Sequence, residues 1–364
     1  MNGLCQGALS VLEKVYDEDS ALYPFTNWLV GREYRSIYDH RMTIRSTINC
    51  LLGLQQASRQ EPDDALLGSV DRQTRRFLAL HGERVLVPGD LGLLLVLLAG
   101  GDADQAGATV ERITAIAERP TALRKLTVQD VSWLLWGCVS AAEAGFAGTE
   151  QLAHRLFDVM ARHFCPRRAA LPCHRVTKAR FGVVSFGACT YFLRAVHDYA
   201  SWCDSTAARQ LFDRALEAIL AAQGPNGEWP WLLRNTDGRP LDVYPVFSVH
   251  QLSMCLLFLC PGSTGCSPHV APAVTSSMEW VKGNNQLGIK MYQQDPFFVY
   301  RSLERRARLP RAERYARALS VSASGRRAAL VENRRLFVNR ESRSYELGWA
   351  LYTHSGNPGL WDPT

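Results

Sequence analysis

Apolar segments of helix length recur along the chain, and they are of two kinds. Six are more apolar than their neighbours, and the first five of these are each followed by a more charged, amphipathic segment. The more apolar segments span 38–56, 90–99, 127–144, 184–202, 247–260 and 343–353. The amphipathic segments span 63–80, 104–118, 149–163, 205–223 and 268–282. Paired helices that repeat in this way are typical of a solenoid or a closed toroid.

The sixth apolar segment has no amphipathic segment after it. The stretch 7–16 is amphipathic and could supply that partner from the other end of the chain. No linker rich in Pro, Gly or Ser divides the sequence, so we expect a single domain over 1–364. We therefore predict an all-α fold, an (α/α)6 toroid of about six helical hairpins. An open helical array is the alternative.

Composition narrows the class of protein. The chain has 364 residues, of which 47% are hydrophobic, and this is enough for a substantial core. The net charge of +6 is spread over a large surface, and short basic stretches such as Arg305-Arg306 are typical of solvated faces. We therefore expect a small-molecule substrate and no nucleic-acid partner.

Targeting signals and cysteines bear on location. Residues 1–13 lack the basic stretch and apolar core of a secretory signal. The longest apolar run, 91–99, is too short to cross a bilayer, so no stable membrane insertion is expected. Many of the ten cysteines fall inside predicted helices, where small buried side chains are more typical than a disulfide framework. These features predict a cytoplasmic protein in a reducing environment, and they leave the oligomeric state open.

Polar clusters mark one rim of the predicted ring. Inner helices of such a ring all run in the same direction, so their N-terminal ends converge. Three of these ends are rich in polar residues, at 38–45, 242–251 and 339–349. Charged side chains are rarely buried without partners, so their presence at the mouths of the most apolar helices indicates a polar pocket.

The rim supplies candidates for catalysis and for substrate binding. His250 could act as a general acid or base near neutral pH, with a carboxylate as its complement. Arginines could hold a carboxylate, phosphate or sulfate through forked hydrogen bonds. The predicted catalytic residues are His250, Asp39, Glu341 and Tyr244. The predicted substrate contacts are His40, Arg41, Arg45, Gln251, Arg343, Tyr345, Glu346, Trp229, Trp231 and Phe186. Alternatively, Asp39 and Glu341 pair with Arg41 and Arg343 and only lock neighbouring hairpins.

One local motif carries a resemblance to known families. Gln223, Gly227 and Trp229 have the spacing Gln-x-x-x-Gly-x-Trp. We expect a helix to end at Gln223, a tight turn to follow, and the indole to pack over the helix end. The motif resembles the QW motif of squalene and terpenoid cyclases, whose toroids use it to tie one helix end to the next hairpin. Similar turns fit six-hairpin glycosidases, lyases and sugar epimerases.

The resemblance implies an α/α toroid and two classes of enzyme. No Asp-x-Asp-Asp string occurs, and Asp63-Asp64 is followed by Ala65, Leu66 and Leu67 rather than by a cyclase-type magnesium site. We therefore expect an enzyme that acts on a saccharide or uronate-like substrate by general acid/base chemistry, as a hydrolase, lyase or epimerase. A terpenoid cyclase or prenyl-processing enzyme with an atypical acid is the alternative, and a non-catalytic binding toroid is a third.

No metal or cofactor is predicted. His163, Cys165, Cys173 and His174 have the right softness for zinc, but their spacing is unlike that of common zinc ligand pairs, and whether they bind a metal stays open. The sequence has no phosphate loop, dinucleotide glycine signature, Gly-x-Ser-x-Gly elbow or His-Glu-x-x-His helix. The commonest nucleotide-binding, serine-hydrolase and metalloprotease functions are thereby disfavoured.

Overall fold

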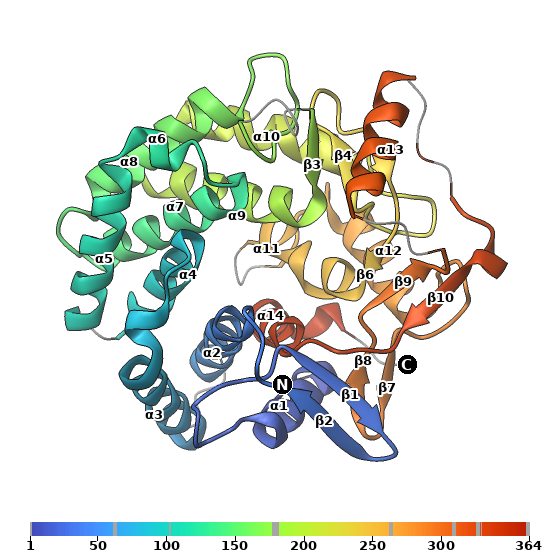
Figure 1. Ribbon diagram of the computed structural model, residues 1–364, viewed down its shortest axis with the longest axis horizontal. Coiled ribbons are helices and arrows are strands. Elements are labelled where there is room, and N and C mark those ends of the chain that lie inside the picture. The colour runs from blue at the N-terminus through green and yellow to red at the C-terminus, as the bar shows by residue number, and fades with distance from the viewer. Residues whose placement is uncertain are drawn as a thin grey trace.

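Two concentric rings of helices make up most of the protein (Figure 1). The computed structural model describes residues 2–60, 64–101, 103–176, 182–261, 265–307, 311–324, 328 and 330–361. The inner ring contains α2 (Thr43–Gln60), α4 (Pro88–Leu98), α7 (Val128–Glu143), α9 (Phe186–Trp202), the π-helical η4 (His250–Met254) with α11 (Leu256–Leu259), and α14 (Ser344–His354). The outer ring contains α1 (Gly3–Val15), α3 (Asp64–His81), α5 (Ala103–Ala117), α8 (Thr149–Val159) with the π-helical η2 (Met160–Phe164), α10 (Thr206–Leu220) and α12 (Ala271–Lys282).

Contacts between neighbouring inner helices close the ring. α2 packs against α4, α4 against α7, and α7 against α9, while η4 contacts both α9 and α14. α14 packs against α2 and completes the circle. α1 lies against α14 although the two come from opposite ends of the chain. The predicted (α/α)6 toroid is confirmed, including the amphipathic partner for the last inner helix.

The two rings differ in how much of each helix is buried. Nearly every residue of α4 is buried, because the outer ring covers one side of it and the neighbouring inner helices cover the others. Outer helix α10 buries a single stripe with helical spacing: Ala208, Leu211, Ala215 and Ile219. The contrast between uniformly apolar and amphipathic segments in the sequence therefore reports the distance of each helix from the centre of the ring.

Glycines allow the inner helices to approach each other closely. A Cβ on Gly53 of α2 would collide with the backbone carbonyl of Gly348 in α14. A Cβ on Gly92 of α4 would likewise collide with the backbone of Trp133 in α7, and Gly137 of α7 faces Gly92 in turn. These contacts fix the relative positions of helices whose N-terminal ends meet at one rim.

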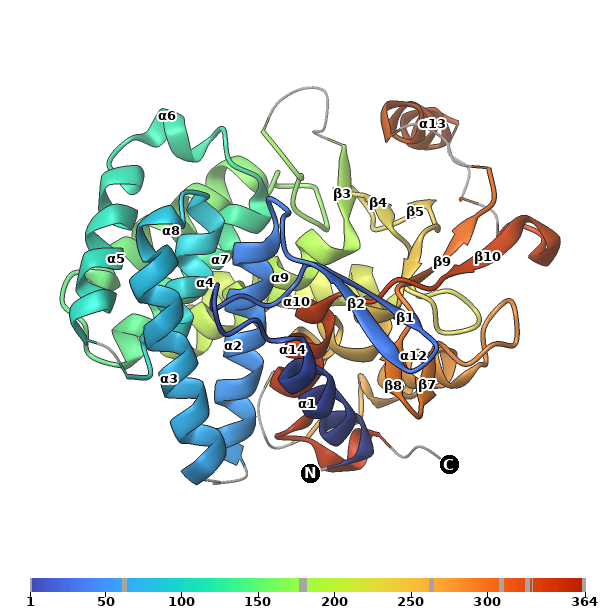
Figure 2. The same cartoon turned by 60° about the horizontal axis from the view of Figure 1, so that its bottom comes forward.

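Short antiparallel strands lie in the connections between the helices and were not predicted (Figure 2). Two hairpins consist of β1 (Thr26–Val30) with β2 (Glu33–Ile37), and β7 (Tyr292–Gln294) with β8 (Phe297–Val299). One sheet has the order β3 (Val183–Ser185), β4 (Leu232–Arg234), β5 (Pro240–Asp242), and another has the order β10 (Leu336–Asn339), β9 (Ser302–Arg305), β6 (Val246–Phe247). Helix α13 (Arg311–Ala323) packs on β5. The remaining short helical turns are η1 (Gly82–Arg84), α6 (Pro120–Leu123), η5 (Asn333–Arg335) and η6 (Pro358–Leu360).

The segment 223–229 ties the end of α10 to the outer helix of the next hairpin. Nε2 of Gln223 donates to the backbone oxygens of Gly227, at 3.0 Å, and of Ala273 in α12, at 2.9 Å. The fully buried Trp229 donates through Nε1 to Oγ of Ser277 in α12, at 2.9 Å. Gly227 has a φ of +86°, which favours glycine at this turn. The expected tight turn and packed indole are both present.

The expectation for the cysteines is wrong at one place. Cys260 and Cys266 form a disulfide, and their Cα atoms lie 4.6 Å apart. The other eight cysteines are free, and six of these are buried as expected for small apolar residues. Among the described residues, no helix is both long and apolar enough to span a membrane. The cytoplasmic location remains a prediction.

Candidate active site

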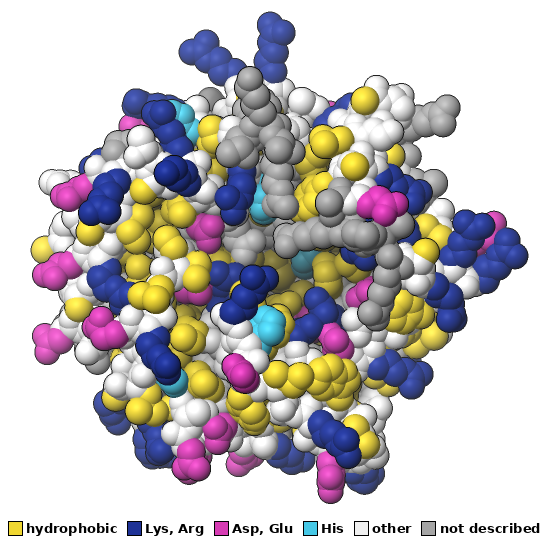
Figure 3. All heavy atoms as spheres, viewed as in Figure 1, with side chains coloured by type: hydrophobic (Ala, Val, Ile, Leu, Met, Phe, Trp, Pro, Cys, Tyr) yellow, Lys and Arg dark blue, Asp and Glu magenta, His cyan; other side chains and the backbone are white. Residues whose placement is uncertain are grey.

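A cavity of about 240 Å³ opens at the centre of the ring, where the N-terminal ends of the inner helices meet. Figure 3 shows the hollow, with hydrophobic side chains on its floor and basic side chains around it. The described residues that line it are Phe25, Met42, Arg45, Ser46, Asn49, Gln129, Trp133, Ser185, Gly187, Tyr191, Trp231, Phe247, Val249, His250, Met254, Arg301 and Tyr345.

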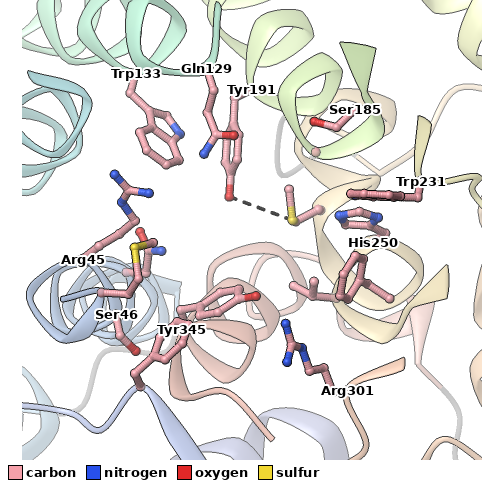
Figure 4. Close-up of a pocket in the computed structure, with 17 residues that line it drawn as sticks. Arg45, Ser46, Gln129, Trp133, Ser185, Tyr191, Trp231, His250, Arg301 and Tyr345 are labelled. Carbon is pink, nitrogen blue, oxygen red and sulfur yellow. Dashed lines mark hydrogen bonds between the residues drawn. The ribbon is translucent and has the colours of Figure 1, made fainter. Parts of the chain in front are cut away.

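Arg45 occupies one side of the cavity, in the first turn of α2 (Figure 4). Its Nε lies 2.5 Å from Oδ1 of Asp90, which is in the first turn of α4. Its guanidinium carbon lies 4.7 Å from the centre of the Trp133 ring. Burial raises the pKa of Asp90, and Arg45 opposes that rise. The carboxylate balances the charge of Arg45, and the indole face holds its guanidinium in place.

Arg301 occupies the opposite side, directly before β9 (Figure 4). Its Nη1 donates to Oε2 of Glu341 at 2.7 Å, and Nη2 of Arg343 donates to the same oxygen at 2.6 Å. The guanidinium of Arg301 lies 5.6 Å from the centre of the Phe247 ring, and that of Arg343 lies 4.1 Å from the centre of the Phe25 ring. Two guanidinium groups therefore share one carboxylate oxygen.

His250 begins η4 and lies close to Trp231 in Figure 4. Its ring centre is 5.0 Å from that of Phe186 and 5.1 Å from that of Phe247. Burial lowers the pKa of His250 to about 3. Its Nδ1 has no hydrogen-bond partner among the described residues. The imidazole is therefore neutral at pH 7, and burial makes it a weaker base than an exposed imidazole.

Two tyrosines project into the cavity. Tyr345, in the first turn of α14, lies between Arg45 and Arg301 in Figure 4. Burial raises its pKa to about 12, so the hydroxyl keeps its proton at neutral pH. Tyr191 of α9 points toward the middle of the cavity, and its hydroxyl donates to Sδ of Met254 at 3.9 Å. Both hydroxyls are potential proton donors to a bound molecule.

Glu346 lies behind this wall, one position after Tyr345 in α14, and is 2% exposed. Neither of its carboxyl oxygens has a hydrogen-bond partner among the described residues. Burial raises its pKa to about 8, although Arg301 and Arg343 lower it. The carboxyl group is therefore mostly protonated at pH 7.

The cavity thus combines aromatic faces, two guanidinium groups and a neutral imidazole, with no carboxylate among the described residues that line it. Aromatic faces can pack against a sugar ring, and guanidinium groups bind acidic groups. Glycoside hydrolysis usually requires two carboxyl groups that flank the scissile bond. The arrangement suits a small ring-shaped acid and proton transfer by an imidazole or a phenol.

Part of the predicted site is assembled at the cavity. The predicted residues that line it are Arg45, Trp231, His250 and Tyr345. Glu341, Arg343 and Glu346 are grouped around Arg301 behind the same wall. Glu341 is paired with Arg343. The alternative, in which this pair only locks neighbouring hairpins, predicts the same contact.

Three predicted residues lie at the rim instead. Asp39, His40 and Arg41 are exposed, because α2 begins only at Thr43 and the residues before it face solvent. The spacing of four between Arg41 and Arg45 would place them on one helical face, but Arg41 lies outside α2. His40 remains near the cavity through its ring, which stacks on Phe25 at 4.2 Å between centres.

Four other predicted residues are buried and do not line the cavity. These are Phe186, Trp229, Tyr244 and Gln251. The Trp229 ring stacks on Phe186 with 5.1 Å between centres, so it cannot contact a bound sugar. The amide of Gln251, oriented to satisfy its hydrogen bonds, donates to Ser277 and Gly227 and accepts from the backbone N–H of Trp229. Tyr244 is 1% exposed, and the guanidinium carbon of Arg305 lies 5.3 Å from the centre of its ring.

Several cavity residues were missed by the sequence interpretation. Gln129 and Trp133 are four apart on α7 and share one face. This spacing, together with Thr127 as the N-cap of α7, is a signal in the sequence that could have identified them. Arg301 gave no such signal, because it lies outside the six apolar segments and their N-terminal ends. It reaches the cavity because β9 pairs with β6, the strand directly before η4. That pairing cannot be deduced from the local pattern.

The candidate zinc ligands do not form a cluster. Among the described residues, no three His, Cys, Asp or Glu side chains are grouped as a metal site requires. Sγ of Cys173 approaches the backbone oxygen of His163 at 3.8 Å, and burial raises its pKa to about 11. Burial therefore favours the neutral thiol of Cys173 rather than the thiolate that binds zinc.

Comparison with known proteins identifies the fold. No family model and no curated protein matches the sequence. Solved structures do match: cellobiose 2-epimerase from Bacillus thermoamylovorans, with 10% identity, TM-score 0.63 and coverage of 96% of this chain and 97% of that one. The α-1,6-mannanase of Salegentibacter sp. matches with 6% identity, TM-score 0.61 and coverage of 98% and 99%. A mutant unsaturated glucuronyl hydrolase from Streptococcus agalactiae matches with 14% identity, TM-score 0.60 and coverage of 99% and 91%. The expected likeness to six-hairpin glycosidase-like toroids is confirmed at the level of the fold.

Proposed function

We propose that this protein is a carbohydrate-active enzyme that uses general acid/base chemistry to transfer a proton at a carbon atom of an acidic sugar such as a uronate. The observation that carries the proposal is the cavity, where neutral His250 and the cation Arg301 face the same space. The fold supports it, because the similar toroids include a cellobiose 2-epimerase and an unsaturated glucuronyl hydrolase.

The size and lining of the cavity suit a sugar ring. The cavity, of about 240 Å³, has room for a sugar ring with its substituents. Trp231, Phe247 and Tyr345 offer aromatic surface on which the apolar face of a ring could pack. Gln129, Asn49 and Ser46 supply amide and hydroxyl groups for sugar hydroxyls on the other side.

The proposed reaction begins with removal of the proton on the carbon next to the carboxylate. The imidazole of His250 takes this proton, and the electron pair of the C–H bond moves onto the carboxylate. Arg301 stabilises the negative charge that develops there. Return of a proton to the opposite face, from Tyr345 or Tyr191, gives an epimer. Alternatively, loss of the substituent one carbon further on, with a proton from Tyr345 or Tyr191, gives an unsaturated product.

Exchange of hydrogen for deuterium tests the proposal. The protein would be incubated with a panel of uronates in D2O, and deuterium at the carbon next to the carboxylate would be measured by NMR. We expect exchange with the wild type and a loss of about 100-fold or more in His250→Gln. His269→Gln is the matched control, because His269 is exposed and paired with Glu217. Absence of exchange with every uronate would contradict the proposal.

Hydrolysis is a second candidate, favoured by one observation. The raised pKa of Glu346, about 8, suits a general acid. Glu346 would have to reach the cavity from behind Tyr345, because it is not among the lining residues. Release of reducing sugar that disappears in Glu346→Gln, without any deuterium exchange, would support hydrolysis over proton transfer at carbon.

The terpenoid alternative has less support. An acid that protonates a polyene must face the hydrocarbon, and no carboxyl group is among the described residues that line the cavity. The Gln223 to Trp229 segment has a structural explanation in its hydrogen bonds to α12. The aromatic walls alone do not distinguish a hydrocarbon from a sugar ring.

A further inference from the structure

The charges around Arg301 do not balance. Arg301 and Arg343 each carry one positive charge, and both bind the same oxygen of Glu341. Glu346, beside them, is 2% exposed and neither of its oxygens is bonded to a described residue, so its burial favours the neutral carboxyl group. One positive charge of this group of four side chains is therefore left without a partner.

The surplus charge reaches the cavity through Arg301. The side chain of Arg301 is 26% exposed and lines the cavity, whereas that of Arg343 is 8% exposed. Arg343 is held away from the cavity by Phe25, on which it packs, and by Thr26, to which it donates a hydrogen bond. A buried charge is stable when it is paired, so an anion bound at Arg301 would complete the group.

The other arginine of the cavity differs in this respect. Arg45 is paired one to one with Asp90, at 2.5 Å, and the side chain of Asp90 is only 8% exposed. Trp133 covers the face of the Arg45 guanidinium. Arg45 can donate hydrogen bonds to a ligand, but it brings no net charge to the cavity.

We propose that Arg301 binds the acidic group of the substrate and that this group carries a single negative charge, as a carboxylate or a sulfate ester does. This assignment rests on the proposed function, since it takes the ligand to be a sugar. A phosphate monoester carries a charge of about −1.5 to −2 at pH 7 and would bring an uncompensated negative charge into the group. The site therefore selects a monoanionic sugar over both neutral and dianionic ones.

Binding measured without turnover tests the assignment. Calorimetry at pH 7 on the full chain would use methyl glucuronide, glucose 6-sulfate, neutral methyl glucoside and glucose 6-phosphate. We expect the wild type to bind one of the two monoanions at least ~10-fold more tightly than the neutral and dianionic sugars. Whether the glucuronide or the sulfate binds more tightly distinguishes a carboxylate site from a sulfate site.

Three substitutions locate the charge that is responsible. Arg301→Met should abolish the preference, and Arg301→Lys should lower it several-fold, because lysine keeps the charge but cannot make forked bonds. Arg45→Met should weaken the binding of all four sugars alike, because burial favours the neutral form of Asp90 once its partner is removed. Arg340→Met is the control, because Arg340 is an exposed arginine next to the same sheet. If melting curves show that Arg301→Met does not fold, Arg301→Lys is used to test the assignment instead.

Each outcome is decisive. Equal binding of the neutral glucoside, tightest binding of the phosphate, or no binding of any of the four would overturn the assignment. A preference that survives in Arg301→Met and is lost in Arg45→Met would also overturn it. A monoanion preference that depends on Arg301, in a protein without deuterium exchange, would refute the proposed reaction and leave this assignment standing.

Discussion

Burial removes the charge from two titratable side chains of the candidate site. His250 is surrounded by aromatic rings and has a pKa of about 3, whereas Glu346 sits behind Tyr345 and has a pKa of about 8. In both, desolvation is the largest cause, and it disfavours the charged form. One residue is thus a neutral base and the other a neutral acid at pH 7, and the two respond to pH in opposite directions.

For His250 we expect a loss of stability in acid. Its folded pKa lies below the ordinary value of 6.5, so the unfolded chain takes up the proton first, and stability falls as pH drops from 6.5 toward 3. His250→Gln lacks this effect. The difference in free energy of unfolding between wild type and variant should shift by about 1.4 kcal/mol per pH unit in this window. Urea titrations at pH 7, 5 and 4 measure it, and parallel pH curves for the two proteins would contradict it.

For Glu346 we expect a loss of stability as pH rises. Its folded pKa of about 8 lies above the ordinary 4.5, so the unfolded chain releases the proton first, and the wild type is destabilised between pH 4.5 and 8. Glu346→Gln is isosteric and does not titrate. Melting temperatures at pH 5, 6.5 and 8 should therefore move in favour of the variant as pH rises. A constant difference would mean that the carboxyl is already ionised in the folded protein.

At this scale the sequence indicated the rim at which the cavity lies, but not which side chains line the cavity. Arg41 and Arg45 have the same chemistry and the spacing of one helical face, yet only Arg45 is inside α2, which begins at Thr43. Trp229 and Trp231 are two apart, and the stacking of Trp229 on Phe186 leaves Trp231 to line the cavity. Side-chain direction at a helix end depends on its first residue, and such boundaries are poorly fixed by apolar periodicity.

Among the elements, the pairs of inner helices depend on close backbone contact. Gly53→Ala would drive a Cβ into the carbonyl of Gly348, so α2 and α14 would have to separate. We expect a loss of roughly 1–3 kcal/mol or more in stability, by analogy with overpacked cores. Gly68→Ala is the matched control: Gly68 lies in α3 with no atom near its missing Cβ, and the change should stabilise by about 0.5–1 kcal/mol. Thermal unfolding of both variants measures this, and equal effects would contradict it.

The helices were predictable and the strands were not, for a physical reason. Each helix presents several turns of apolar spacing, whereas β3, β4 and β5 have only three residues each. An alternating pattern needs more residues than that to stand out. Because the strands were not predicted, Arg301 was not predicted either: it reaches the cavity through the pairing of β9 with β6.

On the scale of the whole molecule, the ring depends on α1 to cover α14. α1 buries Leu4, Ala8 and Leu12 along one stripe. Removal of residues 2–16 should lower the melting temperature sharply or abolish cooperative unfolding, and a peptide of the same residues added in excess should restore it by mass action. A peptide with Leu12→Asp should fail, whereas one with Glu13→Ala, an exposed position, should succeed. An unchanged melting temperature after truncation would contradict this role.

The overall architecture was accessible from the sequence because it repeats. Each hairpin gives the same pair of signals, one uniformly apolar helix and one amphipathic helix, so errors at single boundaries did not change the prediction. The closing pair was predictable only because α14 lacked a following partner and α1 was amphipathic. The chemistry inside the ring has no such repetition, since Arg45, His250 and Arg301 each arrive from a different element.

The contact between α1 and α14 also sets an order of assembly. Among the described helices α1 leaves the ribosome before the others, and α14, which covers its apolar stripe, is made after all the other ring helices. Contacts between segments so far apart in the chain form late and slow folding, because the intervening chain must first be organised. Until then the nascent protein is an open arc with apolar surface at both ends, a form that is prone to aggregate or to bind chaperones. We therefore expect the contact between α1 and α14 to form late in folding.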